Sequence, residues 1–407
     1  MKKTIAKFLF ALSVFGFAFA QDAKDEKIVT NGWADNGKIS YASDKSKIII
    51  DDSAYPDPVN KRKAFTAAIS SSRAAFIVVS GDIDLSDGKV NDNDHSYYDA
   101  FDKDTGARLH EDIKYTVGSN KTIIGTNNAR LMFGGLKISG GARNIIIRNI
   151  TFYDAHGSTE YDTSIEKYKD SKASEDALTI EYKEGGPVAQ NIWIDHCTFT
   201  DGKCRDLTRN FNHDGAFDIK AGKNITISYC EFTNHDKVML IAPGDKYTNA
   251  EERQITIHHS YYHGVTQRNP RSRACQMHLY NNVYDSIGIP ENSGYIFGPG
   301  IGSLYVIENN YIGKTQGPIL NYFDKSEKTD KTFSKIYQSG NTKTITDSNI
   351  KWEKINKVNS LKAHSSDTPV FNIPYEYSLD DAASLKNSVE SQAGANKVKI
   401  TINGAAY

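Results

Sequence analysis

The phrase Asn191-Ile-Trp-Ile-Asp-His-Cys-Thr-Phe199 decides the fold, because close variants of it recur along the middle of the chain. The variants are Asn144-Ile-Ile-Ile-Arg-Asn-Ile-Thr-Phe152, Asn224-Ile-Thr-Ile-Ser-Tyr-Cys-Glu-Phe232, Gln254-Ile-Thr-Ile-His-His-Ser-Tyr-Tyr262, Gln276-Met-His-Leu-Tyr-Asn-Asn-Val-Tyr284 and a less regular copy from Leu304 to Ile312. Successive copies start 47, 33, 30, 22 and 28 residues apart. A shortest spacing near 22 with variable additions is typical of a solenoid whose coils carry loops of different lengths.

Alternation within each copy indicates short β-strands rather than helices. The second and fourth positions are apolar and the seventh is less uniformly apolar or small, whereas the intervening positions are often polar. The seventh positions should stack in a column along the solenoid, and they hold Ile150, Cys197, Cys230, Ser260 and Asn282. We expect Asn282 and Asn310 to form a structural hydrogen-bond ladder, and Cys197 and Cys230 to be stacked interior residues rather than a redox pair or a metal site.

The predicted fold class is all-β, a single-domain right-handed parallel β-helix with long loops. An antiparallel sandwich also produces many short strands, but it does not explain the shared Asn/Gln-Ile-x-Ile phrase. The amphipathic segment Lys61–Arg73 precedes the apolar strand Phe76–Ser80, which predicts a helix that caps the N-terminal end of the solenoid. The less repetitive tail after about Lys325 is expected to pack along its side, so that residues 21–407 form one domain.

The N-terminus has the pattern of a secretory signal peptide. Three lysines within the first seven residues precede an apolar stretch, Phe8–Phe19, that is too short for an ordinary membrane-spanning helix. Small residues at Ala18 and Ala20 predict cleavage after Ala20, which makes residues 1–20 the signal peptide. We therefore expect an exported protein that is extracellular, with the periplasm as the alternative, and that does not associate with a membrane.

Charge and cysteine content exclude two further classes of protein. Loss of the three N-terminal lysines lowers the formal net charge from −1 to −4, which argues against a general nucleic-acid binder. Four cysteines are too few for a disulfide scaffold in a chain of 407 residues, although they allow up to two bridges. They are Cys197, Cys204, Cys230 and Cys275.

Two polar segments suggest a site for a polymer that carries carboxylates. The run Arg268-Asn-Pro-Arg-Ser-Arg273 supplies guanidinium groups that match a carboxylate, and His213-Asp-Gly-Ala-Phe-Asp218 supplies oxygen ligands suited to calcium. In a regular strand Asp214 and Asp218 would lie about 13 Å apart on one side, so the chain must bend between them, plausibly at Gly215. Pro270 interrupts the alternation that would otherwise place Arg268 and Arg273 on opposite sides.

Several phrases together resemble the polysaccharide lyase family 1 pectate lyases, in the order of that family. They are Trp193-Ile-Asp-His196, Asp214-Gly-Ala-Phe-Asp218, His235-Asp-Lys237, His258-His259, Arg268-Asn-Pro-Arg-Ser-Arg273 and His278-Leu-Tyr-Asn-Asn282. Weaker similarity extends from about Gly32 to the tail Gln392-Ala-Gly-Ala-Asn-Lys397. The resemblance implies a parallel β-helix with a calcium-dependent site on one sheet and its flanking loops.

The resemblance also implies roles for individual residues. The calcium ligands are Asp176, Asp214 and Asp218, the substrate-binding residues are Lys237 and Arg273, and the catalytic base is Arg268. Asp195 and His196 are expected to hold adjacent coils together. No catalytic role or zinc site is assigned to His258, His259 and His278, which lie within the repeating strands and are interpreted as coil-surface residues.

The implied activity is cleavage of polygalacturonate by β-elimination, which yields unsaturated oligogalacturonides. We expect Ca²⁺ as cofactor, an acidic polysaccharide as the partner, no nucleic acid, and a monomer. A lyase for methyl-esterified pectin is the closest alternative, but neutral esters would not need Asp214 and Asp218. A glycoside hydrolase would use carboxylates as acid and base or nucleophile without Arg268, and a secreted adhesin or polysaccharide-binding protein would hold acidic chains without cleaving them.

Overall fold

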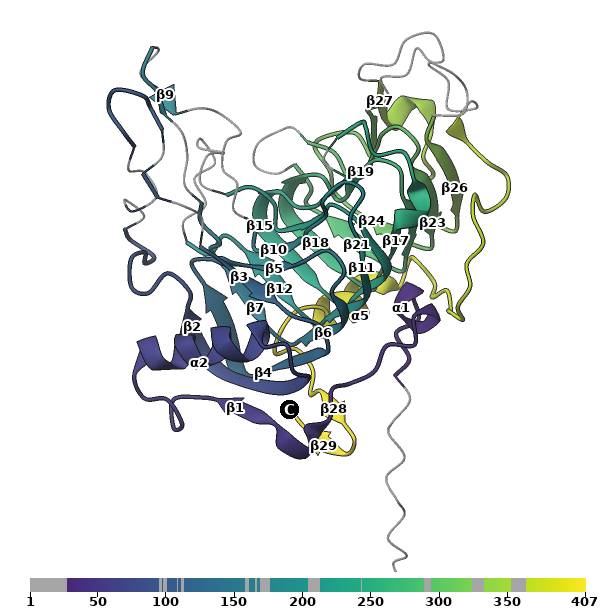
Figure 1. Ribbon diagram of the computed structural model, residues 1–407. Coiled ribbons are helices and arrows are strands. Elements are labelled where there is room, and N and C mark those ends of the chain that lie inside the picture. The colour runs from purple at the N-terminus through teal and green to yellow at the C-terminus, as the bar shows by residue number, and fades with distance from the viewer. Residues whose placement is uncertain are drawn as a thin grey trace, which may run out of the picture.

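The chain forms a right-handed parallel β-helix (Figure 1), as the repeated phrase predicts. The computed structural model describes residues 28–94, 97, 101–107, 109–110, 113–157, 161–164, 167–168, 176–203, 213–242, 244–288, 294–323, 333–352 and 364–407. The predicted signal peptide and Cys204 lie outside these residues.

Two long parallel sheets make up the solenoid. The larger sheet has two rows of strands joined at the N-terminal end by β4 (Lys121–Met132), which pairs with β2 (Ala75–Asp84), and β2 pairs with β1 (Ile48–Ile50). Its first row contains β6 (Arg143–Arg148), β11 (Ala189–Asp195), β14 (Gly222–Ser228), β17 (Arg253–His258), β20 (Gln276–Tyr280), β23 (Leu304–Glu308) and β26 (Lys335–Ser339). Its second row contains β7 (Thr151–Tyr153), β12 (Thr198–Thr200), β15 (Glu231–Lys237), β18 (Tyr261–Gln267), β21 (Val283–Asp285) and β24 (Tyr311–Ile312).

The smaller sheet closes each coil, and the candidate site lies where the second row of the larger sheet leads into it. It contains β3 (Lys114–Val117), β5 (Gly135–Ile138), β10 (Leu178–Ile180), β13 (Phe217–Ile219), β16 (Leu240–Ile241), β19 (Arg271–Ser272) and β22 (Gly298–Pro299). Three two-stranded sheets pair β8 (Tyr161–Asp162) with β9 (Lys167–Tyr168), β25 (Leu320–Tyr322) with β27 (Ile350–Trp352), and β28 (Thr401–Ile402) with β29 (Ala405–Ala406). Short 3₁₀ turns are η1 (Asp44–Ser46), η2 (Ala250–Glu252) and η4 (Asp347–Asn349).

The interior consists of columns of equivalent side chains along the length of the solenoid. The second positions of the repeat, from Ile145 to Tyr305, and the fourth positions, from Ile147 to Ile307, are all fully buried. The ninth positions form an aromatic stack in which neighbouring ring centroids are 4.7 to 5.1 Å apart. This regular burial explains the alternation of apolar and polar residues. Each strand turns one face to the interior, where its side chains stack on the equivalent side chains of the next coil.

The seventh positions form the predicted column, which is fully buried and becomes polar toward the C-terminal end. The backbone N–H of Ser260 donates to Asn282 Oδ1 at 3.0 Å, and that of Asn282 donates to Asn310 Oδ1 at 2.9 Å. The ladder continues one coil further, to Asn341 Oδ1 at 2.9 Å from Asn310 N, which the sequence did not indicate. Among the described cysteines, Cys197, Cys230 and Cys275 are free and buried, consistent with packing roles.

Left-handed backbone explains the asparagine that opens the repeated phrase. Asn144, Asn191 and Asn224 have φ values of 56°, 57° and 55°, a conformation that asparagine tolerates better than most residues. Their side chains also stack, with Asn224 Nδ2 donating to Asn191 Oδ1 at 2.9 Å. The phrase therefore marks the corner at which each coil enters the first row of strands.

The predicted capping helix is present, but its bounds differ from the expectation. Helix α2 spans Pro58–Ser70, because Asp57 caps it by accepting a hydrogen bond from Asn60 N at 2.8 Å and Pro58 suits the first helical position. Phe65 and Ile69 are fully buried against the first coil. The helix thus covers the N-terminal end of the solenoid (Figure 1).

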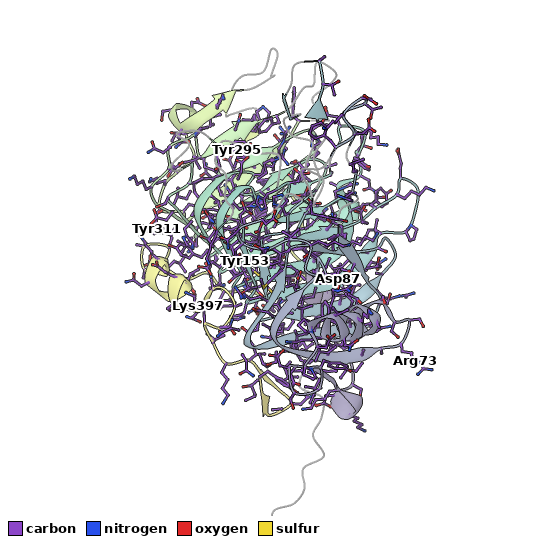
Figure 2. All side chains as sticks on the ribbon, turned by 90° about the vertical axis from the view of Figure 1, so that its left-hand side faces the viewer. Arg73, Asp87, Tyr153, Tyr295, Tyr311 and Lys397 are labelled. Carbon is purple, nitrogen blue, oxygen red and sulfur yellow. The ribbon has the colours of Figure 1, made fainter. Side chains whose placement is uncertain are left out.

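The two terminal segments pack on the outside of the coils, the N-terminal one on the first row of strands and the C-terminal one on both rows. Residues 28–42, which include α1 (Trp33–Asn36), lie on β11, β14 and β17, a placement that the sequence did not predict. Residues 364–407 run back along the solenoid as expected of the tail, with α5 (Leu385–Gln392) packed near Tyr311 (Figure 2) and the C-terminus beside the first coils (Figure 1). Every helix in the described part of the chain is too short or too polar to span a bilayer.

The histidines His258, His259 and His278 require a correction. They lie on the outer side of the coils, but His258 and His278 are only 2% and 0% exposed because the terminal segments cover them. His258 Nε2 lies 2.8 Å from the carbonyl oxygen of Thr30, and His278 Nδ1 lies 2.8 Å from the Tyr375 hydroxyl. His258 and His278 therefore contact the terminal segments and are not exposed at the surface of the coils.

Asp195 joins three consecutive coils, as expected. Its carboxylate accepts from Arg148 Nε of the preceding coil at 2.8 Å and from Ser228 Oγ of the next coil at 2.5 Å, and it lies 2.7 Å from His196 Nδ1. Burial opposes ionisation, yet His196 and then Arg148 hold the pKa of Asp195 well below its usual range. The ionised carboxylate therefore stabilises the fold.

Asp195→Asn is expected to lower the free energy of unfolding by about 3 kcal/mol at pH 7, because it leaves the buried Arg148 without its counter-ion. The depressed pKa means that this stabilisation is present above about pH 4 and is lost as the pH falls toward the folded-state value. Urea unfolding of both proteins at several pH values measures the difference. Asp82→Asn, which breaks the exposed pair with Arg130, is the control and should cost less than about 1 kcal/mol. Equal losses in the two variants would contradict a structural role for Asp195.

Candidate active site

The predicted site residues come together at one corner of the solenoid, on consecutive coils. Asp176 precedes β10 and lies opposite Gly215, since Gly215 N donates to Asp176 Oδ1 at 2.8 Å. Gly215 in turn pairs with Lys237 at the end of β15, and Lys237 pairs with Gln267, next to Arg268. Residues far apart in the sequence thus occupy equivalent places in the stack of coils.

The chain does bend between Asp214 and Asp218, but the bend is centred on Ala216. The backbone N–H groups of Ala216 and Phe217 both donate to the carbonyl oxygen of Val238, each at 3.0 Å, so β13 begins only at Phe217. Gly215 has another function, because a Cβ atom there would lie 2.8 Å from Asp176 Oδ1 and closer still to Asp218 Oδ1. The missing side chain leaves the space into which the two carboxylates project.

Two of the three acidic side chains, Asp176 and Asp218, are buried, and Asp214 is half-buried near them. Burial, and then the Asp176 and Asp214 carboxylates, raise the pKa of Asp218 well above its usual range. Burial also raises the pKa of Asp176, with a further contribution from Asp214, although Lys114 opposes the shift. Such a group of oxygen ligands suits a hard divalent cation, which would relieve the mutual repulsion.

Polar neighbours hold each carboxylate in place. Asp176 Oδ2 accepts from Thr179 Oγ1 at 2.8 Å and lies 3.6 Å from Lys114 Nζ. Asp214 Oδ1 accepts from Lys237 Nζ at 3.1 Å. Asp218 Oδ1 accepts from the backbone N–H of Leu240 at 2.8 Å. The sequence gave no indication of Lys114, because it belongs to no repeated phrase and lies 62 positions before Asp176.

The arginines occupy the turn from β18 to β19 and the end of β19. Arg268 has a left-handed backbone with φ 61°, and its Nε atom is buried without a hydrogen-bond partner among the described residues. It is close enough to Asp218 to counteract the rise in the pKa of that carboxyl group. An unusual backbone and an unsatisfied guanidinium nitrogen at one residue indicate a functional constraint on Arg268.

Arg271 and Arg273 complete the positive side of the site. Arg273 Nε donates to Asp245 Oδ1 at 2.5 Å, and one terminal nitrogen donates to the carbonyl oxygen of Ala242 at 3.0 Å. The Arg271 guanidinium lies 3.9 Å from the centroid of the Phe323 ring, and burial together with repulsion from Arg273 and Arg268 lowers its pKa. Arg268 and Arg273 thus each lie close enough to Arg271 to repel its charge. Asp245 was missed, since no sequence motif links it to Arg273.

The arrangement brings a cluster of carboxylates next to a cluster of cations. A cavity of about 930 Å³ lies elsewhere, between residues 28–45 and Pro374–Glu376, and contains none of the predicted site residues. The acidic and basic side chains of the coil corner can together bind a divalent cation and an anionic chain. A proton acceptor next to that chain would be Arg268.

Comparisons of the sequence with known proteins identify the family of this chain. The family model described as "Pectate lyase" matches residues 6–398. A pectate lyase of Bacillus subtilis (strain 168) is 34% identical over 314 residues, which cover 73% of this chain and 68% of that protein. Pectate lyase E of Dickeya chrysanthemi is 29% identical over 398 residues, which cover 93% of each chain.

Solved structures of similar fold lead to the same family. A pectate lyase bound to a hexasaccharide has a TM-score of 0.66 and 25% sequence identity, and covers 93% of this chain and 100% of that one. A mutant of Bacillus subtilis pectate lyase has a TM-score of 0.66 at 23% identity with the same coverage, which supports the fold. Together with the family match over most of its length, these similarities establish that the chain belongs to the pectate lyase family.

Proposed function

We propose that this pectate lyase cleaves polygalacturonate by calcium-dependent β-elimination, with Arg268 as the catalytic base. The observation that carries the proposal is the convergence of Asp176, Asp214 and Asp218 beside Arg268 on consecutive coils. A lyase for anionic pectate needs both a cation site and a base next to the bound sugar. The corner of the solenoid offers both.

Calcium is proposed because the donor set fits it. Asp176 and Asp218 are buried and project into the space left by Gly215, and burial together with the Asp176 carboxylate raises the pKa of Asp218. All the proposed ligand atoms are oxygens, which is the set that calcium prefers. Asp176, Asp214 and Asp218 would hold the ion, which when bound would supply positive charge that stabilises the negative charge developing when the carbon next to a substrate carboxylate loses its proton.

The remaining steps are assigned to the chain's own side chains. Lys237 and Arg273 would hold acidic groups of the polymer, Arg273 through its planar fork of donors. Arg268 would take the proton from C5, the electron pair of that bond would form the C4–C5 double bond, and the C4–O bond would break with protonation of the leaving oxygen. Arginine accepts a proton only in its neutral form, so the rate should rise with pH.

Product absorbance tests the proposal directly. Elimination creates a double bond conjugated with the carboxylate, which absorbs in the ultraviolet, whereas hydrolysis creates only reducing ends. The expected result is that absorbance and reducing ends increase together on polygalacturonate. Reducing ends without absorbance would favour a glycoside hydrolase, and binding without either product would favour a non-catalytic polysaccharide-binding protein.

Substrates of different methylation separate the two lyase activities. Activity should fall as the methyl-ester content of pectin rises, because neutral esters do not provide carboxylates for calcium, Lys237 and Arg273. Higher activity on fully esterified pectin would overturn the assignment of pectate as the substrate. We further propose that residues 1–20 direct export, and that residues 21–407 act as a single-domain monomer outside the cytoplasm.

Gly215→Ala is expected to raise the calcium concentration needed for half-maximal activity by about 10-fold or more, a loss of the size caused by disturbing ligand geometry. The added methyl group would displace the Asp176 and Asp218 carboxylates. Activity measured against calcium concentration gives the shift. Gly88→Ala is a control for the substitution itself, because no atom lies within 4 Å of the added Cβ there, although its φ of 75° adds some backbone strain. An unchanged calcium requirement in Gly215→Ala would show that these carboxylates do not bind the ion.

A further inference from the structure

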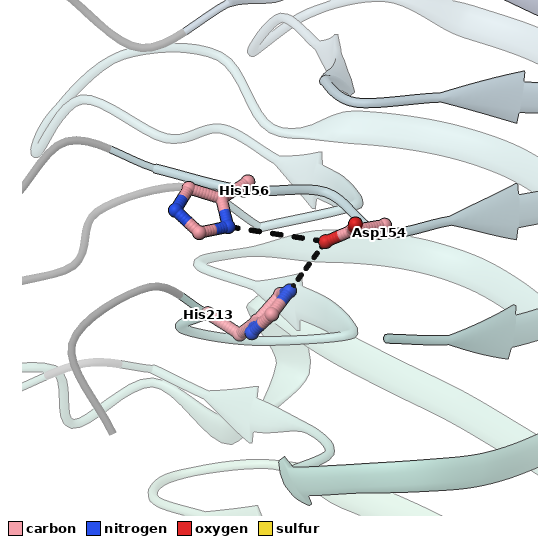
Figure 3. Close-up of side chains that lie close together, drawn as sticks. All are labelled: Asp154, His156 and His213. Carbon is pink, nitrogen blue, oxygen red and sulfur yellow. Dashed lines mark hydrogen bonds and ion pairs between the residues drawn. The ribbon is translucent and has the colours of Figure 1, made fainter. Parts of the chain in front are cut away.

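A buried cluster of two histidines and one aspartate lies beside the proposed calcium site but takes no part in it. Asp154 follows β7, His156 lies two residues further on, and His213 directly precedes Asp214 (Figure 3). These side chains are 0%, 0% and 9% exposed. Within the described ranges, this is the only group of three metal-ligating residues that places one ligand atom from each within 4.8 Å of the others.

The spacing of the ligand atoms fits a four-coordinate metal ion. His213 Nε2 lies 2.8 Å from Asp154 Oδ1, and His156 Nδ1 lies 3.9 Å from the same oxygen. Zinc bonds of about 2.0–2.2 Å in tetrahedral geometry separate neighbouring ligand atoms by about 3.4 Å, a value between these two distances. The ring centroids of His156 and His213 are 5.3 Å apart and the ring planes are inclined by 76°, so both rings can face the same point (Figure 3).

Asp201 lies on the far side of His213 from Asp154. Its Oδ2 atom lies 3.8 Å from Nδ1 of His213, and its Oδ1 atom lies 2.5 Å from Nδ1 of His235. A carboxylate beside the far nitrogen of a histidine is the usual support of a metal-bound imidazole, and Asp201 is within ion-pair range of that nitrogen although beyond hydrogen-bond distance. Nε2 of His213, which lies 2.8 Å from Asp154 Oδ1, would bind the metal in its deprotonated form.

We propose that Asp154, His156 and His213 form a second metal site, for Zn²⁺ or a similar first-row transition metal. Two imidazoles and one carboxylate suit zinc, cobalt or nickel, whereas calcium prefers oxygen ligands throughout. A dication would also balance the two buried carboxylates, Asp154 and Asp201. The proposal does not depend on the catalytic role of any residue.

The site would have a structural effect on the neighbouring acidic cluster. It would connect the coil that contains β7 with the segment His213–Asp218, which carries Asp214 and Asp218. His235 lies on the other side of Asp201. Its Nε2 atom is 3.1 Å from the carbonyl oxygen of Asp214 and 3.2 Å from that of Lys237. The metal would therefore anchor the backbone from which the proposed calcium ligands project.

Metal analysis of the folded enzyme tests this proposal. Chelated protein is dialysed against excess calcium and then titrated with Co²⁺ and, separately, Zn²⁺. We expect the wild-type protein to bind one equivalent of either metal, with the visible absorption of four-coordinate cobalt and a rise in Tm. His156→Leu should lose this equivalent, whereas His364→Leu, which removes another fully buried imidazole, should retain it.

Two results would overturn the proposal: no binding by the wild-type protein in excess calcium, or equal binding by the wild-type protein and His156→Leu. In either case Asp154 and His213 would share only a hydrogen bond. If His156→Leu does not fold, X-ray absorption by the zinc-loaded wild-type protein decides the question. A shell with two imidazole nitrogens would support the site, and a shell made only of oxygens would exclude it.

Discussion

Arg268→Lys is expected to reduce turnover on polygalacturonate by roughly 10² or more, the scale of a lost acid–base group. Lysine keeps the positive charge and much of the reach, but it loses the guanidinium that is partly buried beside Asp218 with an unsatisfied Nε atom. Calcium and substrate binding should change little, because lysine keeps a positive charge beside Asp218. Turnover at saturating substrate and calcium, together with direct calcium titration, measures the two effects separately.

Arg273→Lys is the matched control for this experiment. It makes the same substitution five positions along the same turn, where Arg273 is fixed by Asp245 and Ala242. Its proposed task is to hold a carboxylate, so KM should rise at least as much as turnover falls. Near-normal turnover of Arg268→Lys at neutral pH would remove Arg268 from the mechanism and would require another base near Asp218.

Removal of calcium is expected to abolish activity, and calcium alone should restore it. The acidic cluster has no role in elimination without its cation, and chelation leaves the carboxylates of Asp176, Asp214 and Asp218 without the divalent ion, although Lys114, Lys237 and Arg268 lie beside them. Initial rates after chelation, and after addition of calcium, provide the measurement. Full activity after exhaustive chelation would reject calcium as the cofactor.

Asp218→Ala makes the same test at a single residue. The calcium requirement should rise by about 10-fold or more, while circular dichroism and Tm should show a folded β-helix, because Asp218 lies in β13 between the core residues Phe217 and Ile219 and is itself outside the apolar columns. Asp82→Ala, at an exposed ion pair, should leave the calcium requirement unchanged. Failure of Asp218→Ala to fold would instead indicate a structural role for this carboxylate.

The fold was predictable because each coil repeats the same pattern of apolar and small residues. Ile192, Ile194 and Cys197 occupy positions whose apolar or small character recurs in the coils on either side, so the periodic pattern alone indicated the parallel stack. The same reasoning predicted the Asn282–Asn310 ladder. It missed Asn341, because the last coil lacks the repeated phrase although the side chain continues the ladder.

The grouping of the site was predictable only in part. Phrases in the chain indicated Asp214, Asp218, Arg268 and Arg273, and the structure places the first three beside one another. The sequence attributed the bend to Gly215, whereas the structure places it at Ala216 and gives Gly215 the role of leaving room for the carboxylates. The position of the bend depends on which carbonyl oxygen of the next coil accepts from each backbone N–H. No local sequence pattern indicates these partners.

The sequence by itself determined the class of fold, the coil period, the central acidic and basic segments and the capping helix, since each depends on neighbours along the chain or on a period repeated from coil to coil. The tertiary structure decided which distant residues meet there. Lys114 reaches Asp176, Asp245 fixes Arg273, and the chain termini cover His258 and His278. These contacts depend on loop lengths and on how the coils stack. They join residues far apart in the chain, so no periodic pattern in the sequence indicates them.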